Sequence, residues 1–125
     1  MRRSAVSEKI IIAHLTSNDP VTAGKALRFS KSALSYSSTV ILLLSAHGVS
    51  VADKTKESFT VPTTQENALD TIRQFLKDGG RVFVGLDDMK SLGISAADII
   101  AGCEQAETGY LFNILLSDQA VIMSW

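Results

Sequence analysis

The chain has 125 residues, of which 46% are hydrophobic and 20% are charged. A chain of this length buries roughly two-thirds of its unfolded surface, so we expect a single domain that needs no disulfide or metal for support. The composition excludes a disordered or low-complexity protein, and its apolar surplus favours an oligomer. Twelve Lys and Arg residues against thirteen Asp and Glu residues give a net charge of −1, which excludes a strongly basic surface for nucleic acid or anionic lipid.

The sequence also predicts where the protein acts. Its single cysteine, Cys103, cannot form an intramolecular disulfide, which favours a reducing compartment. The longest aliphatic run, residues 40–44, is far shorter than the roughly 20 apolar residues of a membrane span. Arg2 and Arg3 precede an apolar run that is too short for a signal-peptide core. We therefore expect a cytoplasmic protein that has no membrane partner.

The first half of the chain alternates between strand and helix patterns. Residues 9–15 and 39–45 are short continuous apolar runs, typical of strands covered on both faces of a parallel sheet. An Asp-Pro pair at 19–20 provides an N-cap and a first helical residue, and the apolar spacing then predicts a helix over 20–36. Residues 49–62 show neither period and predict an exposed excursion, with a short strand at most.

The second half predicts further alternation. The capping-box pattern of Thr63 and Glu66 begins a predicted helix over 64–78, and Ser95 and Asp98 form a second capping pair. The other expected elements are a strand over 81–86, a turn or single helical turn over 87–92, helical residues 96–101 and 104–116 with a kink or break at Gly102, and a strand over 119–124. This order predicts a three-layer α/β/α sandwich with a mainly parallel sheet of four or five strands.

Ligands of such sheets bind beyond the carboxyl ends of the strands, where loops converge. Three predicted loops occupy that position. Their candidate ligand-binding side chains are His14, Thr16, Asn18, Ser45, His47, Asp87, Asp88 and Met89.

Motifs for nucleotide binding and for serine hydrolysis do not match. Gly24-Lys25 is followed by Ala26 and lacks the leading glycine of a Walker loop, and neither G-x-G-x-x-G nor G-x-S-x-G is present. The loop over 16–20 resembles a flavodoxin phosphate loop only in its Thr, Ser and Asn content. We therefore expect no cofactor and no resident metal.

The two histidines allow two interpretations. His14 and His47 fall at the ends of two predicted strands, where they could join Asp87 or Asp88 as metal ligands or as an acid–base pair. In the alternative, His14 is a hydrogen-bonded core residue and the two aspartates cap the turn that follows them.

Cys103 also allows two interpretations. It follows Gly102 at the predicted start of the last long helix, where unsatisfied N–H groups would lower the thiol pKa and make it nucleophilic. Alternatively it is a small buried apolar side chain, which the absence of a nearby basic residue favours.

Three segments carry short motifs of a known family: KIIIAHLTSNDP, VILLLSAHGVSVADK and FLKDGGRVFVGLDDMKSLGISAADIIAGCEQA. The most specific motif runs from Gly93 to Gly102 and follows the pattern G-(I/L)-x-x-x-(D/E)-(L/I)-(I/V)-x-G, and the turn at His47-Gly48-Val49 is similar to a (D/H)GV turn. Together they resemble the DsrE/DsrF-like family, which includes sulfur-relay subunits.

The resemblance implies a sandwich that assembles into trimers or hexamers and interacts with sulfur-relay partner proteins. In active members, a cysteine in the loop after the strand equivalent to 81–86 carries sulfane sulfur as a persulfide. Here that loop, residues 85–91, reads GLDDMKS and contains no thiol. Asp and Met cannot replace a thiolate nucleophile, and Cys103 does not align with it.

Three hypotheses follow from these observations. The first is an oligomeric, non-catalytic subunit or binding module related to intracellular sulfur relay. The second is a sulfur carrier in which Cys103 takes the sulfur and His14 or His47 accepts the proton. The third is a small-ligand module formed by the loops at the carboxyl ends of the strands.

Overall fold

The computed structural model describes residues 6–125. Arg2 and Arg3, which were considered above as the start of a signal peptide, lie outside the described residues. Five strands form one sheet in the order β4-β3-β2-β1-β5, and every neighbouring pair is parallel. They are β1 (Ser7–Leu15), β2 (Ser37–Leu44), β3 (Arg81–Gly85), β4 (Glu104–Ala106) and β5 (Ala120–Ser124). The predicted α/β fold with a parallel sheet is confirmed.

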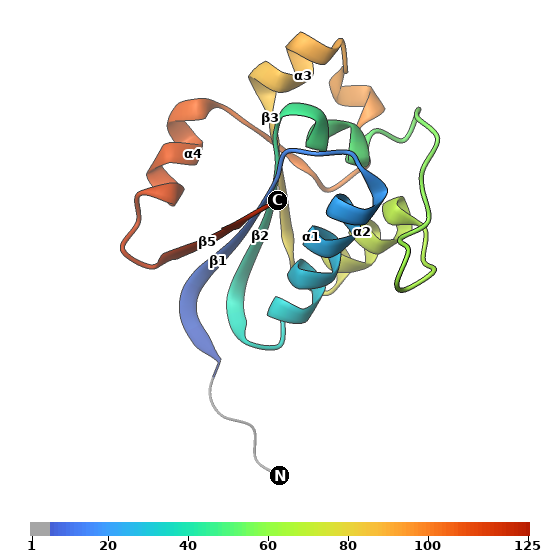
Figure 1. Ribbon diagram of the computed structural model, residues 1–125. Helices are drawn as coiled ribbons and strands as arrows, with labels where there is room; N and C mark the ends of the chain where they lie inside the picture. The colour runs from blue at the N-terminus through green and yellow to red at the C-terminus, as the bar shows by residue number, and fades with distance from the viewer. Residues whose placement is uncertain (1–5) are drawn as a thin grey trace.

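Helices cover both faces of this sheet. The four α-helices are α1 (Pro20–Ala33), α2 (Ala68–Lys77), α3 (Leu86–Leu92) and α4 (Thr108–Leu115), and the 3₁₀ helices are η1 (Ala46–Ala52) and η2 (Ala96–Asp98). Figure 1 shows α1 and α2 on one face, α4 on the other, and α3 beyond the carboxyl end of β3. The carboxyl ends of the strands, η1 and α3 therefore share one edge of the molecule.

The two faces carry cores of unequal size. The larger core lies under α1 and α2 and includes Leu42, Ile72 and Phe75. The smaller core lies under α4 and consists of five buried residues, which are Ile12, Ile41, Leu43, Phe83 and Ala106. Full burial of one such aliphatic side chain stabilises the fold by about 1.5–3 kcal/mol, so the α1–α2 face supplies most of the hydrophobic stabilisation.

Three predicted element boundaries are confirmed. The Asp19 side chain accepts a hydrogen bond from the Thr22 backbone N–H at 3.0 Å and caps α1, with Pro20 as its first residue. Gly93 adopts a φ of 69° and ends α3. Ser95 and Asp98 form the expected capping box, although it opens only the three residues of η2 rather than helical residues 96–101.

The helix expected over 64–78 begins later, and the predicted capping box at Thr63 is wrong. Gln65 has a φ of 62°, in the left-handed region, and this conformation excludes a helix across it. Asn67 is the N-cap instead, because its Oδ1 accepts the Asp70 N–H at 3.2 Å.

The excursion expected over 49–62 is exposed only in part. Val49, Val51 and Ala52 belong to η1 and are buried in the larger core. Residues 54–57 are exposed, as predicted. A short 3₁₀ helix has too few residues for its hydrophobic periodicity to distinguish it from a loop. This explains why the sequence did not predict that η1 is buried.

The helix expected over 104–116 is a strand followed by a shorter helix. Glu104 pairs with Phe83 in the parallel register of β3 and β4. The Arg81 guanidinium donates two hydrogen bonds to the Glu104 carboxylate, at 3.0 and 2.8 Å, and thereby fixes the start of β4.

The chain leaves β2 through a tight contact at Gly48. A Cβ built on Gly48 would lie 2.2 Å from the Leu15 carbonyl oxygen at the end of β1. The Ser45 N–H donates to the same oxygen at 3.0 Å, and the Gly48 N–H donates to the Ser45 carbonyl at 2.9 Å. Only glycine therefore lets η1 pack against the end of β1.

We predict that Gly48→Ala lowers the free energy of unfolding by about 2–3 kcal/mol or more, because backbone rather than a flexible side chain must move. Urea denaturation measures this as a lower midpoint with an unchanged slope. The matched control is Gly109→Ala in α4, where no atom lies within 4 Å of the added Cβ and helix propensity favours alanine by up to about 1 kcal/mol. Equal midpoints for the two variants would contradict the packing argument.

Candidate functional site

The parallel register brings two predicted site residues together on the α4 face of the sheet. Side chains alternate between faces along a strand, and Ile12 and Leu43 both belong to the smaller core on this face. His14 and Ser45 lie two residues further along and therefore point to the same face. His14 Nε2 and Ser45 Oγ share a hydrogen bond.

Asp88 joins this pair from α3. A Cβ on Gly85 would lie 2.6 Å from Asp88 Oδ2, so the absence of a side chain at 85 lets the carboxylate fold over the end of β3. There it acts electrostatically on His14. We call His14, Ser45 and Asp88 the polar row, because they lie across the ends of β1, β2 and β3.

Two opposing effects set the protonation of His14. Partial burial lowers its pKa, and the nearby Asp88 carboxylate raises the pKa by a smaller amount. The net pKa lies below the ordinary value of 6.5, so the ring is mainly neutral near pH 7. A neutral imidazole can accept a hydrogen bond at one ring nitrogen and donate one at the other. The polar row can therefore hold a polar ligand, and His14 can accept a proton from the Ser45 hydroxyl.

The other candidates in the first two loops lie elsewhere. Thr16 donates its hydroxyl to the Trp125 carbonyl at 3.0 Å and closes the chain end against β1. His47 is exposed, and its carbonyl accepts the Ser50 hydroxyl at 2.8 Å. Asn18 donates to Ser50 Oγ at 3.3 Å and faces a different hollow, which is described below.

The β3–α3 loop divides its three candidates. Asp88 belongs to the polar row, whereas Asp87 Oδ2 accepts the Thr108 hydroxyl at 3.4 Å. Neither aspartate caps a helix, because both lie inside the first turn of α3. Met89 is 2% exposed and packs in the larger core, so its side chain does not face a ligand as the sequence predicted.

Cys103 does not start a helix but directly precedes β4. It packs against the larger core on the α1–α2 face of the sheet, whereas the polar row lies on the α4 face, and β3 and β2 separate β4 from β1. Burial against the larger core, with a smaller contribution from the Glu104 carboxylate, raises the pKa of Cys103 to about 12. The interpretation as a buried, unreactive thiol fits this position, and the reactive one does not.

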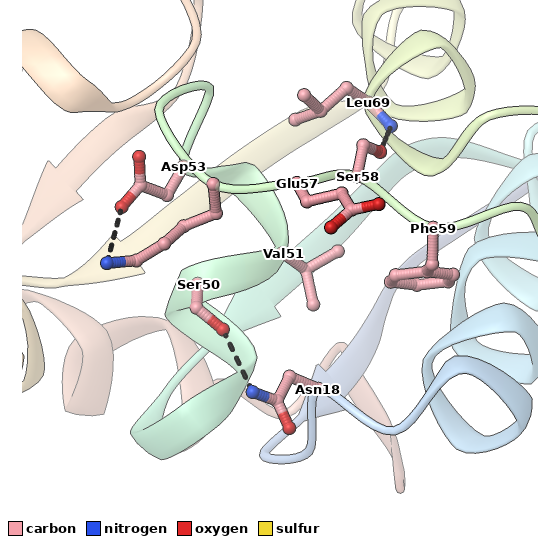
Figure 2. Close-up of a pocket in the computed structure, with 9 residues that line it drawn as sticks. Asn18, Ser50, Val51, Asp53, Glu57, Ser58, Phe59 and Leu69 are labelled. Carbon is pink, nitrogen blue, oxygen red and sulfur yellow. Dashed lines mark hydrogen bonds and ion pairs between the residues drawn. The ribbon is translucent and has the colours of Figure 1, made fainter.

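A hollow of about 200 Å³, separate from the polar row, opens between the loop after β1, η1, residues 56–59 and the start of α2 (Figure 2). It is lined by Asn18, Ser50, Val51, Asp53, Lys56, Glu57, Ser58, Phe59 and Leu69. Sequence reasoning found only Asn18 among these. The aperiodic stretch 49–62 gave no signal that its residues would fold back beside α2.

Within residues 6–125, no three His, Cys, Asp or Glu side chains come close enough together to hold a metal ion. The same part of the chain contains no helix of the length and hydrophobicity that crossing a membrane requires.

Comparison with protein families assigns the fold to a class of small α/β proteins. The family model described as the DsrE/DsrF-like family matches residues 9–123, which include the polar row and all of the sheet except the first two residues of β1 and the last residue of β5. The chain therefore belongs to the DsrE/DsrF-like family. A search of curated proteins found no match.

Solved structures share this fold. The E. coli protein ychN superposes with a TM-score of 0.75 at 18% identity, over 95% of this chain and 100% of its own. A protein of unknown function from Methanobacterium thermoautotrophicum, MTH1491, also gives a TM-score of 0.75, at 11% identity, over 94% and 99% of the two chains. Both matches extend over almost the whole of each protein.

We predict that Asp88→Asn lowers the pKa of His14 further, because it removes the charge that favours the imidazolium form. NMR titration of the His14 ring protons measures this shift. Asp87→Asn is the matched control, since Asp87 contacts Thr108, and it should leave the His14 pKa nearly unchanged. A larger shift in the control would mean that Asp88 does not face His14.

Proposed function

We propose that the protein is a non-catalytic subunit of a DsrE/DsrF-like assembly connected with sulfur relay in the cytoplasm, and that it does not itself carry the sulfur. The observation that supports this is the composition of the β3–α3 loop. At the carboxyl edge, where the family resemblance places the sulfur-bearing cysteine, residues 85–91 offer two carboxylates and a buried thioether.

The chemistry of sulfur transfer requires a thiolate. The thiolate attacks the outer sulfur of a donor persulfide, the donor's S–S bond breaks, and the donor leaves as its own thiolate. A carboxylate is too weak a nucleophile toward sulfur, and the thioether of Met89 already carries two carbon substituents. The loop therefore lacks the group that this step needs.

Cys103 is a poor substitute for that thiolate. With a pKa of about 12 it is almost entirely protonated near pH 7, and it lies on the opposite face of the sheet from His14, with two strands between β4 and β1. Neither a proton acceptor of the polar row nor an open crevice is available to it. The carrier hypothesis through Cys103 thus has little geometric support.

An exposed apolar surface supports self-association. We call it the α4–β5 surface. Ile122 lies on the α4 face together with Tyr110, Phe112 and Leu116, and Val121 and Met123 extend the surface around the edge of the sheet, because side chains alternate along β5. β5 is the last strand of the sheet, so its outer backbone edge pairs with no other strand of the described chain. An apolar edge strand beside an apolar helix suits burial by a second copy of the chain, and the family resemblance favours a trimer or hexamer.

We predict that the native chain gains no sulfur when it is incubated with a low-molecular-weight persulfide, as measured by intact mass under non-reducing conditions. Asp87→Cys, at an exposed position of the same loop, should gain one sulfur atom because it supplies the missing thiolate. Cys103→Ser controls for the buried thiol and should behave like the native chain. A sulfur adduct on the native chain that Cys103→Ser abolishes would support the carrier hypothesis instead.

We predict that Leu116→Asp converts the assembly to a monomer, because a charge would be buried at the interface. Leu116 is 77% exposed, so the fold should tolerate the change. Light scattering coupled to gel filtration at micromolar concentration measures the mass. Val21→Asp is the matched control on α1, where Val21 is 55% exposed, and should remain oligomeric. A native chain that is already monomeric would overturn the proposal.

A further inference from the structure

The hollow of Figure 2 has an apolar floor and a polar rim. Val51, Phe59 and Leu69 form the floor, and all three pack with the larger core of the α1–α2 face. The volume of about 200 Å³ corresponds to six or seven waters at roughly 30 Å³ each, and it is below the roughly 300 Å³ at which pockets for drug-sized ligands begin. A ligand for this hollow is therefore small.

Most polar groups of the rim are already satisfied by the protein. The Ser50 hydroxyl donates to the His47 carbonyl at 2.8 Å, so its oxygen is the acceptor for the Asn18 amide N–H at 3.3 Å. Ser58 Oγ likewise accepts the Leu69 N–H and lies within hydrogen-bond distance of Asn67, at 3.3 and 3.2 Å. These hydroxyls have little capacity left for a polyhydroxylated ligand.

The charged groups of the rim are not balanced. Asp53 is 2% exposed, its Oδ1 accepts hydrogen bonds from Thr55, and its Oδ2 lies 3.9 Å from the Lys56 ammonium. Asp53 and Lys56 therefore neutralise each other. The exposed Glu57 carboxylate lines the hollow and makes no hydrogen bond or ion pair with any residue of the described chain.

We propose that this hollow binds a small organic ammonium ion, with the charged nitrogen at the Glu57 carboxylate and the hydrocarbon part on Val51, Phe59 and Leu69. The ammonium pairs with the one charged residue lining the hollow that has no ion pair within the described chain, in a charge-assisted hydrogen bond. The Phe59 ring adds a favourable aromatic surface for such a cation. This site lies on the α1–α2 side of the sheet, away from the α4–β5 surface, so it does not depend on the self-association proposed above.

The test compares three probes that share a phenylethyl group and differ in the charge of the group attached to it: phenethylammonium, neutral 2-phenylethanol and anionic 3-phenylpropanoate. Amide chemical shifts in ¹⁵N NMR spectra locate the site and give the affinity. We expect phenethylammonium to bind most tightly, to shift the amides of Val51, Glu57 and Phe59, and to weaken as salt is raised. Tighter binding of the anion would place the ligand's charge at Lys56 and overturn the proposal, as would equal binding of all three probes or no shift at these amides.

The variant Glu57→Gln keeps the shape of the side chain and removes its charge. We expect it to weaken phenethylammonium binding by about tenfold and to leave 2-phenylethanol binding unchanged. Glu8→Gln, an exposed position at the amino end of β1, is the matched control and should bind like the native chain. Native affinity in Glu57→Gln would show that Glu57 is not the recognition group.

Discussion

All five strands run in the same direction, and this constraint determines where polar chemistry can gather. The carboxyl ends of β1, β2 and β3 meet at one edge, so His14, Ser45 and Asp88 lie together although they come from distant parts of the sequence. The end of this sheet is closed by the contact of Gly48 with the Leu15 carbonyl. That contact directs η1 across the edge, where Leu15 and Leu44 at the ends of β1 and β2 are fully buried.

The two faces of the sheet are covered unequally, and this leaves large apolar side chains of α4 and β5 exposed. α1 and α2 bury one face under a large core, whereas a single eight-residue helix, α4, covers the other. None of the residues of α4 is fully buried, and β5 exposes three large apolar side chains in succession. His14 pairs in register with Ser124 of β5, so the polar row adjoins the exposed edge strand of the sheet.

The sequence contained enough information for the fold but for only part of the site. Continuous apolar runs identify parallel strands, because a strand that is buried on both faces is apolar at every position. The carboxyl ends of these strands then indicated where His14, Ser45 and Asp88 lie. Local patterns misplaced two helices, since a positive φ at Gln65 and the pairing of Glu104 with Phe83 depend on tertiary contacts. The hollow beside α2 escaped notice for the same reason: Glu57 and Phe59 become neighbours of Leu69 only after an aperiodic segment folds back.

Cys103 follows the family motif directly in the sequence, but its surroundings in the fold do not favour a reactive thiolate. Cys103 directly precedes the edge strand β4 and packs against the larger core next to Glu104 of the Arg81–Glu104 ion pair, whereas the polar row lies on the other face of the sheet, beyond β3. Desolvation and the Glu104 carboxylate both disfavour a thiolate there, so proximity in sequence to the family motif confers no nucleophile. What the carboxyl edge retains is a neutral histidine, a hydroxyl and a carboxylate, which are groups suited to hydrogen bonding and proton exchange and not to carrying sulfur.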